Sequence, residues 1–133
     1  MPDRTQGDPV DHLLGELEAA IMRLMWARSA GTVRDILGEL RASGRLLAYT
    51  TVMTVMSRLV GKAVLRRELA GKTHVYRAAV TREEFVQNAA AAQVQALVTE
   101  FGDLAIAQFL AQVTSLSPHR RRQLERLTRG EAP

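Results

Sequence analysis

The sequence predicts a mainly α-helical protein that contains one small β-hairpin, and three observations support this. Apolar residues recur at steps of three and four through most of the chain, which is the period of an amphipathic helix. Residues 64–78 change to two short runs around a glycine turn, a pattern typical of paired strands. A second helical region follows from residue 81, so the expected class is α+β with helices dominating.

The N-terminal part predicts an arm followed by two helices. Residues 1–12 are polar and contain two prolines and a glycine, so we expect a flexible arm there. The first helix is expected from Leu14 to Trp26, with its apolar residues on one face. Thr32 is a good N-cap for a second helix, which the Ser43-Gly44 pair ends.

A third helix is expected from Tyr49 to Gly61, and its two faces differ. One face carries the apolar stripe of Val52, Val55, Met56 and Leu59. The other carries hydroxyl groups, and threonine and valine are poor helix formers in isolation. Tertiary packing must therefore hold this helix, and a separate requirement must account for the hydroxyl groups on its open face. The methionines at helical spacing, including Met53, are expected in the core.

Two short strands are expected at residues 64–69 and 73–78, joined by Ala70-Gly71-Lys72. A lone hairpin is marginally stable in water, so it must pack on the helices. Three helices followed by a hairpin is the order of a winged helix-turn-helix domain, which we expect over residues 13–79. In that arrangement the third helix enters the major groove of DNA, and the hairpin lies against the backbone or the minor groove.

Basic residues are concentrated in the same part of the chain. Residues 41–77 contain eight lysines and arginines and one acidic residue, Glu68. Such a segment suits a polyanion, although a merely solvated basic surface is the alternative. Hydroxyl groups can reach base edges, and the cations can neutralise phosphates. The candidate DNA-binding residues are Tyr49, Thr50, Thr51, Thr54, Ser57, Arg58, Lys62, Arg66, Arg67 and Lys72.

Residues 81–129 predict a helical dimerisation region. Thr81 and Glu84 form a capping box, and Ser117-Pro118 begins the last helix. These helices have too few large apolar residues to close a core alone, so we expect a second copy to cover them. Two-fold symmetry then predicts a palindromic DNA site. The candidate interface residues are Phe85, Val94, Leu97, Val98, Phe101, Phe109, Leu110 and Val113.

Several classes of function are excluded or disfavoured. The chain has no cysteine, which excludes disulfides, thiolate metal sites and cysteine nucleophiles. Its three histidines lack metal-site spacing, and no HExxH, GxSxG, P-loop or GxGxxG motif occurs. We therefore expect no enzyme activity, no cofactor and no metal. No apolar run is long enough for a membrane span and no signal peptide is apparent, so the expectation is a cytoplasmic protein without membrane insertion.

Three segments resemble the penicillinase-repressor family (BlaI/MecI). The segment Leu46–Leu59 resembles its recognition helix, with the string Ala-Tyr-Thr-Thr-Val the most specific part. The segment Gly15–Trp26 resembles the family's opening helix, which typically ends in tryptophan, and the hairpin ending His74-Val-Tyr-Arg77 also fits. The resemblance extends over about residues 13–128.

This resemblance implies a homodimeric winged-helix repressor that binds palindromic operators with TACA/TGTA-like half-sites. It implies that the C-terminal helices form the dimer, where a membrane sensor-protease cleaves an Asn-Phe bond in the best-known members. The matching position is Gln108-Phe109, with glutamine in place of asparagine; the alternative role of Phe109 is an interface anchor. The copper-responsive branch uses a cysteine cluster that this chain lacks. A repressor released by a small-molecule ligand, and a helical protein–protein adaptor with a basic face, are the alternatives.

Overall fold

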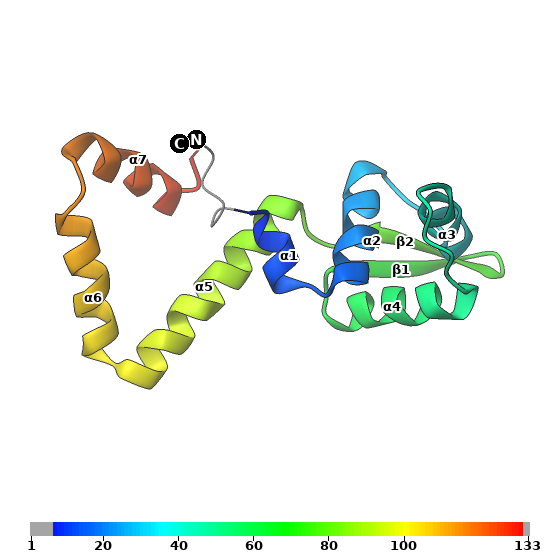
Figure 1. The fold of residues 1–133 in the computed structure, drawn as a ribbon, viewed down its shortest axis with the longest axis horizontal. Helices are drawn as coiled ribbons and strands as arrows, with labels where there is room; N and C mark the ends of the chain where they lie inside the picture. The colour runs from blue at the N-terminus through cyan, green and yellow to red at the C-terminus, as the bar shows by residue number, and fades with distance from the viewer. Residues whose placement is uncertain (1–6, 132–133) are drawn as a thin grey trace. The chain divides into compact units, whose positions relative to one another are not determined.

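A computed structural model describes residues 7–131, and the chain divides into two compact units within a long helix, after Ala89 (Figure 1). The first unit contains α1 (Pro9–Leu13), α2 (Glu16–Ala27), α3 (Val33–Ala42), α4 (Tyr49–Gly61), β1 (Leu65–Ala70), β2 (Thr73–Ala78) and the start of α5 (Arg82–Phe101). The second contains the rest of α5, α6 (Asp103–Thr114) and α7 (Pro118–Thr128). The mainly α class with a small antiparallel hairpin is confirmed.

The prediction of a flexible arm over residues 1–12 is wrong from residue 9 onward, where the chain is helical. Residues 9–13 form α1, which Asp8 caps by accepting a hydrogen bond from the Val10 N–H at 3.0 Å. Val10 is fully buried, and Asp8 also forms an ion pair with Arg82 at 2.6 Å. The polar composition hid this helix because a single buried valine and a cap hold it. Residues 1–6 of the predicted arm lie outside the described residues.

The apolar faces of α2, α3 and α4 meet in one core. Thr32 caps α3 as predicted, accepting from the Asp35 N–H at 3.1 Å while the Asp35 carboxylate accepts from the Thr32 N–H. The predicted stripe of α4 is buried, and it places the hydroxyl-bearing face of that helix outward. Met53 was expected in the core with the other methionines, but 39% of its surface is exposed.

The hairpin gains its stability from the core rather than from its own turn. β1 and β2 pair antiparallel, with Leu65 opposite Ala78, and Gly71 adopts a φ of +67° in the turn. Tyr76 is the inward residue of β2 and is 2% exposed, whereas His74 is exposed. The backbone of Tyr76 also exchanges two hydrogen bonds with Gly31, at 2.8 and 3.0 Å, which attach β2 to the α2–α3 connection.

Glu18 is a buried carboxylate on α2, and Lys62 is its partner at the end of α4. The Lys62 Nζ donates to both carboxylate oxygens at 2.9 and 3.0 Å, and the Gly15 N–H donates at 3.0 Å. Burial raises the pKa of Glu18, but the hydrogen bonds from Lys62 and Gly15 outweigh it, so the pKa lies below its ordinary value. The charged form of Glu18 therefore stabilises the fold.

We expect Glu18→Gln to lower the free energy of unfolding by about 1–3 kcal/mol at pH 7, because a charge-assisted hydrogen-bond network is lost. A carboxyl with a lowered pKa stabilises above its unfolded-state pKa, and that stability is lost as pH falls through the folded-state pKa. The difference in unfolding free energy between variant and wild type should therefore shrink as the pH falls below the ordinary pKa of a glutamate side chain. Urea unfolding from pH 7 to pH 3 measures this. The control Glu16→Gln, at a surface carboxylate paired with Arg45, should change little; a loss at Glu18 that is constant with pH would contradict the assignment.

The second unit leaves much apolar surface uncovered. Gly102 ends α5 with a φ of +60°, and Ser117 caps α7 with Pro118 at its first position, as the sequence predicts. Phe101 is 51% exposed and Leu110 is 59% exposed. One copy of the chain therefore leaves this apolar surface without a partner. Between residues 7 and 131, none of the helices has the length and apolar character that a bilayer crossing requires.

Candidate nucleic-acid interface

The exposed face of α4 presents a row of hydroxyl groups. Thr50, Thr51 and Thr54 are exposed, because the valine, methionine and leucine stripe fixes the opposite side of the helix in the core. Threonine hydroxyls are short enough to reach base edges, and threonine methyls can contact thymine methyls. Tyr49 begins the helix and is 42% exposed beside them. The geometry of this face is what the helical period predicts; its contact with DNA stays a prediction.

The hairpin lies beside this face of α4. The Arg67 Nη1 on β1 donates a hydrogen bond to the Ser57 Oγ on α4 at 3.2 Å. Ser57 is half-buried, whereas Arg58, one residue further along, is exposed. This hydrogen bond joins a candidate DNA-binding residue of the helix to one of the hairpin, and the two are ten residues apart in the sequence.

The charge of this region is smaller than the tally over residues 41–77 indicates. Three of its cations are paired: Arg45 with Glu16, Lys62 with Glu18, and Arg77 with Glu68. Two of these carboxylates come from α2, outside the segment. Lys62 was predicted to contact phosphate, but the structure places it as the partner of a buried carboxylate. Within residues 7–131, the candidates that form no ion pair are Arg58, Arg66, Arg67 and Lys72.

Two residues near this surface were missed by sequence reasoning. Arg34 on α3 lies over the ring of Tyr49, with its guanidinium carbon 5.8 Å from the ring centroid. No spacing rule connects positions 34 and 49, so the sequence offered no signal for this pair. The exposure of Met53 could have been predicted from the sequence, because this residue lies beside the apolar stripe of α4 and not on it.

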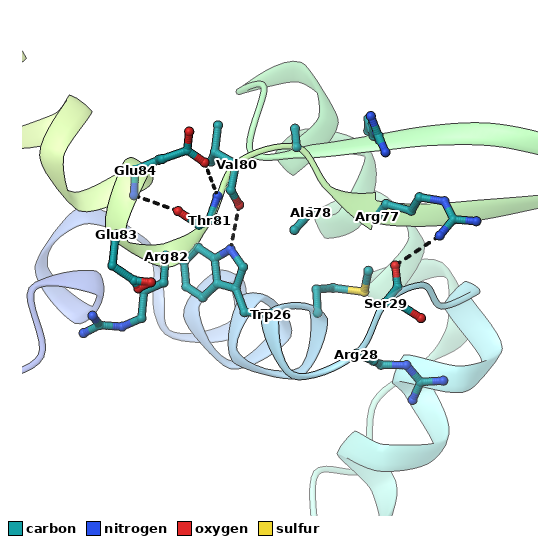
Figure 2. A pocket seen from close by; sticks show the side chains of 13 residues that line it. Trp26, Arg28, Ser29, Arg77, Ala78, Val80, Thr81, Arg82, Glu83 and Glu84 are labelled. Atoms are coloured by element: carbon teal, nitrogen blue, oxygen red, sulfur yellow. Dashed lines mark hydrogen bonds between the residues drawn. The ribbon is translucent and has the colours of Figure 1, made fainter. Parts of the chain in front are cut away.

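A second surface lies where α2, the hairpin and the start of α5 meet, around a cavity of about 490 Å³ (Figure 2). The Trp26 Nε1 donates to the Val80 carbonyl at 3.0 Å, and Thr81 with Glu84 forms the predicted capping box. Three of the guanidinium groups that line this cavity already have carboxylate partners: Arg28 with Asp35 and Glu39, Arg77 with Glu68, and Arg82 with Asp8. Arg66, the fourth guanidinium of the lining, forms no ion pair within the part of the chain that the structure describes, but Glu83 and Glu84 add two carboxylates to the same lining. The cavity is therefore mixed in charge and is not an assembled site for an anionic ligand.

Phe85, one of the predicted dimer residues, lies at this junction. Its ring centroid lies 5.9 Å from that of Trp26, and it packs half-buried against the core of the first unit. Together with the ion pair between Asp8 and Arg82, this contact attaches the first turns of α5 to the first unit. Phe85 therefore has a partner within one copy, and its assignment to the dimer interface stays a prediction.

The remaining dimer candidates lie in the second unit. Val98 is half-buried, and the others are 39–59% exposed: Val94, Leu97, Phe101, Phe109, Leu110 and Val113. Leu104 and Ile106 are exposed apolar residues that the sequence reasoning missed. Gln108 and Phe109 lie next to Phe101 around an almost wholly apolar cavity of about 300 Å³. This surface is suited to apolar side chains from another helix.

Comparison with known proteins agrees with this architecture. Residues 14–129 match the family described as penicillinase repressor. The chain is 40% identical over 74 residues to proteins named transcriptional regulator BlaI from two strains of Mycobacterium tuberculosis, CDC 1551 / Oshkosh and ATCC 25618 / H37Rv. These matches cover 55% of this chain and 53% of each relative, so the chain spans about half the length of the curated relatives it matches. Because the family match extends through both units, the chain belongs to the penicillinase repressor family.

Proposed function

We propose that this chain is a transcriptional repressor that binds a palindromic DNA operator as a homodimer. The observation that carries the proposal is the exposed hydroxyl face of α4, held beside a hairpin whose Arg67 contacts Ser57. In this proposal α4 enters the major groove, and Thr50, Thr51 and Thr54 contact base edges. Arg58, Arg66, Arg67 and Lys72 neutralise phosphates, which adds affinity for any sequence. Membership of the penicillinase repressor family, and the name of the BlaI relatives, support the repressor role.

The uncovered apolar surface of the second unit supports the homodimer in this proposal. Phe101, Phe109 and Leu110 are exposed in a single copy, and a second copy would remove them from water. A two-fold dimer carries two copies of α4, so its operator has two inverted half-sites. The family resemblance supports TACA/TGTA-like arms for those half-sites.

The proposal includes release of the operator by proteolysis of the repressor. The bond between Gln108 and Phe109 lies inside α6, so this segment must unwind before it can enter an extended protease cleft. A cognate membrane sensor-protease would be the partner. Fragments that end at Gln108 in induced cells would support this step, and an intact chain during full derepression would contradict it.

Selection from random duplex DNA, at about 150 mM salt, tests the function directly. The purified protein should enrich an inverted repeat with TACA/TGTA-like arms. Binding that shows no motif and disappears as salt rises would overturn the proposal, because such binding reports only phosphate neutralisation.

Replacing Arg67 by alanine should weaken binding to operator and to random duplex by the same factor. The slope of log affinity against log salt should become shallower by about one, since one phosphate contact is lost. Affinities measured at four or more salt concentrations give this slope. Ser57→Ala is the matched control for the salt slope alone: it removes the hydrogen-bond partner of Arg67 but keeps the charge, so the slope should not change. A loss confined to the operator would contradict a backbone role for Arg67.

A further inference from the structure

A cleft of about 300 Å³ lies between the beginnings of α3 and α4 and the tip of the hairpin. Its polar residues come from separate elements: Thr32 and Arg34 at the start of α3, Tyr49 from α4, and Lys72, Thr73, His74 and Tyr76 from the hairpin turn and β2. Val33 and Met53 add an apolar part to the lining. The cleft therefore combines cationic and hydroxyl groups with apolar surface.

Arg34 lies against an aromatic ring even without a ligand. Its guanidinium group lies over the Tyr49 ring at 5.8 Å, which restricts a long and flexible side chain. The adjacent carboxylate, Asp35, accepts from the Thr32 N–H at 2.9 Å and forms an ion pair with Arg28 at 3.6 Å. This carboxylate is therefore engaged elsewhere and does not compensate Arg34.

Lys72 reaches the same cleft from the opposite side. Within residues 7–131 neither Arg34 nor Lys72 forms an ion pair, although both line this space. Two cations that meet in one cleft repel each other, and an anion bound between them removes that repulsion. A phosphodiester is such an anion, and its deoxyribose has apolar carbons that can pack on Met53.

We propose that this cleft binds one backbone phosphate of DNA together with the attached deoxyribose. The proposal rests on the proposed function, because the cleft is bounded by the start of α4 and the tip of the hairpin, the two elements placed there against DNA. Arg34 and Lys72 supply the charge, and Thr73 and His74 supply hydrogen-bond donors. Phosphate contacts set register and orientation, so this phosphate fixes the angle at which α4 enters the groove.

Arg34→Ala is the direct test. The affinity for operator and for random duplex should fall by the same factor, roughly tenfold, as expected for one charged hydrogen bond. The salt slope should become shallower by about 0.9, the value for one phosphate of duplex DNA. Arg120→Ala, which removes an exposed arginine from α7 in the second unit, is the matched control and should leave the slope unchanged. Equal slopes for the two variants would overturn the proposal.

A second experiment locates the phosphate. A set of duplexes is prepared, each with one neutral methylphosphonate linkage at a different position of the half-site. At one position the neutral linkage should lower the affinity of the wild type and leave the affinity of Arg34→Ala unchanged. Tyr49→Phe should keep the same loss of affinity at that linkage, because the ring under Arg34 remains. Tyr49→Leu removes the ring, so the loss of affinity at that linkage should be smaller. Failure of every position to discriminate would overturn the cleft as a phosphate site.

The two proposals fail in different ways. A wild type that binds duplex DNA without a preferred sequence would overturn the sequence-specific repressor, yet the Arg34 slope on random duplex would still decide the cleft. A wild type that binds a motif, with an unchanged slope for Arg34→Ala, would overturn the cleft alone. A wild type that binds no duplex at any salt would overturn both.

Discussion

We expect that replacing Thr54 by tyrosine will abolish operator recognition and leave the folded protein intact. Thr54 lies on the exposed face of α4, opposite the buried stripe, so the larger side chain displaces no core residue. If α4 enters the major groove as proposed, the added ring will hold the helix away from the bases, and the affinity should fall to the level of random duplex. That difference is roughly a thousandfold or more for specific DNA-binding proteins.

Fluorescence anisotropy with the selected operator and a scrambled duplex measures the two affinities, and thermal unfolding confirms the fold. Thr54→Ser keeps the hydroxyl group and removes the methyl group. An intermediate loss of affinity, seen only for operators with thymine at the contacted base pair, would identify a contact between the two methyl groups. Thr128→Tyr, at the exposed end of α7, is the control for a bulky substitution outside the proposed interface. An equal loss on operator and scrambled duplex would mean that Thr54 does not read bases.

Most helix boundaries could be predicted because each depends on local chemistry. Thr32 and Ser117 cap helices with their own side chains, and Gly102 adopts a conformation that favours glycine. The hydroxyl face of α4 could be predicted for the same reason, since a helical period is visible within two turns. The helix α1 could not, because its stability comes from a single buried valine, Val10, and from bonds to distant residues.

The pairings within the candidate interface could not be read from the sequence. Lys62 and Glu18 are 44 residues apart, and Arg34 and Tyr49 meet only because α3 and α4 pack against each other. A charge tally over one segment therefore counted Lys62 as free and overlooked Arg34. Phe85 shows the same limit for apolar residues, because the helical period gives the face of a residue and not the partner that covers it.

The substitution of Phe109 and Leu110 by alanine should convert the dimer to a monomer. Both residues are exposed in one copy, and Phe109 lies beside the apolar cavity with Phe101. A buried phenylalanine or leucine truncated to alanine costs about 2–5 kcal/mol, and each change occurs twice in a symmetric dimer. The dimer dissociation constant should therefore rise by roughly a thousandfold or more.

Sedimentation equilibrium at low micromolar concentration distinguishes the two states, and Gln112→Ala on the same helix is the control at an exposed polar position. A dimer that persists in the double variant would show that other residues form the interface. The monomer should keep the base preference of one half-site, because α4 belongs to the separately packed first unit. Its affinity for the whole operator should nevertheless fall steeply, since the second half-site no longer binds as part of the same molecule. The Thr54 and Phe109 variants thus lose operator binding for opposite reasons: one stays dimeric and loses base preference, and the other keeps base preference and loses the dimer.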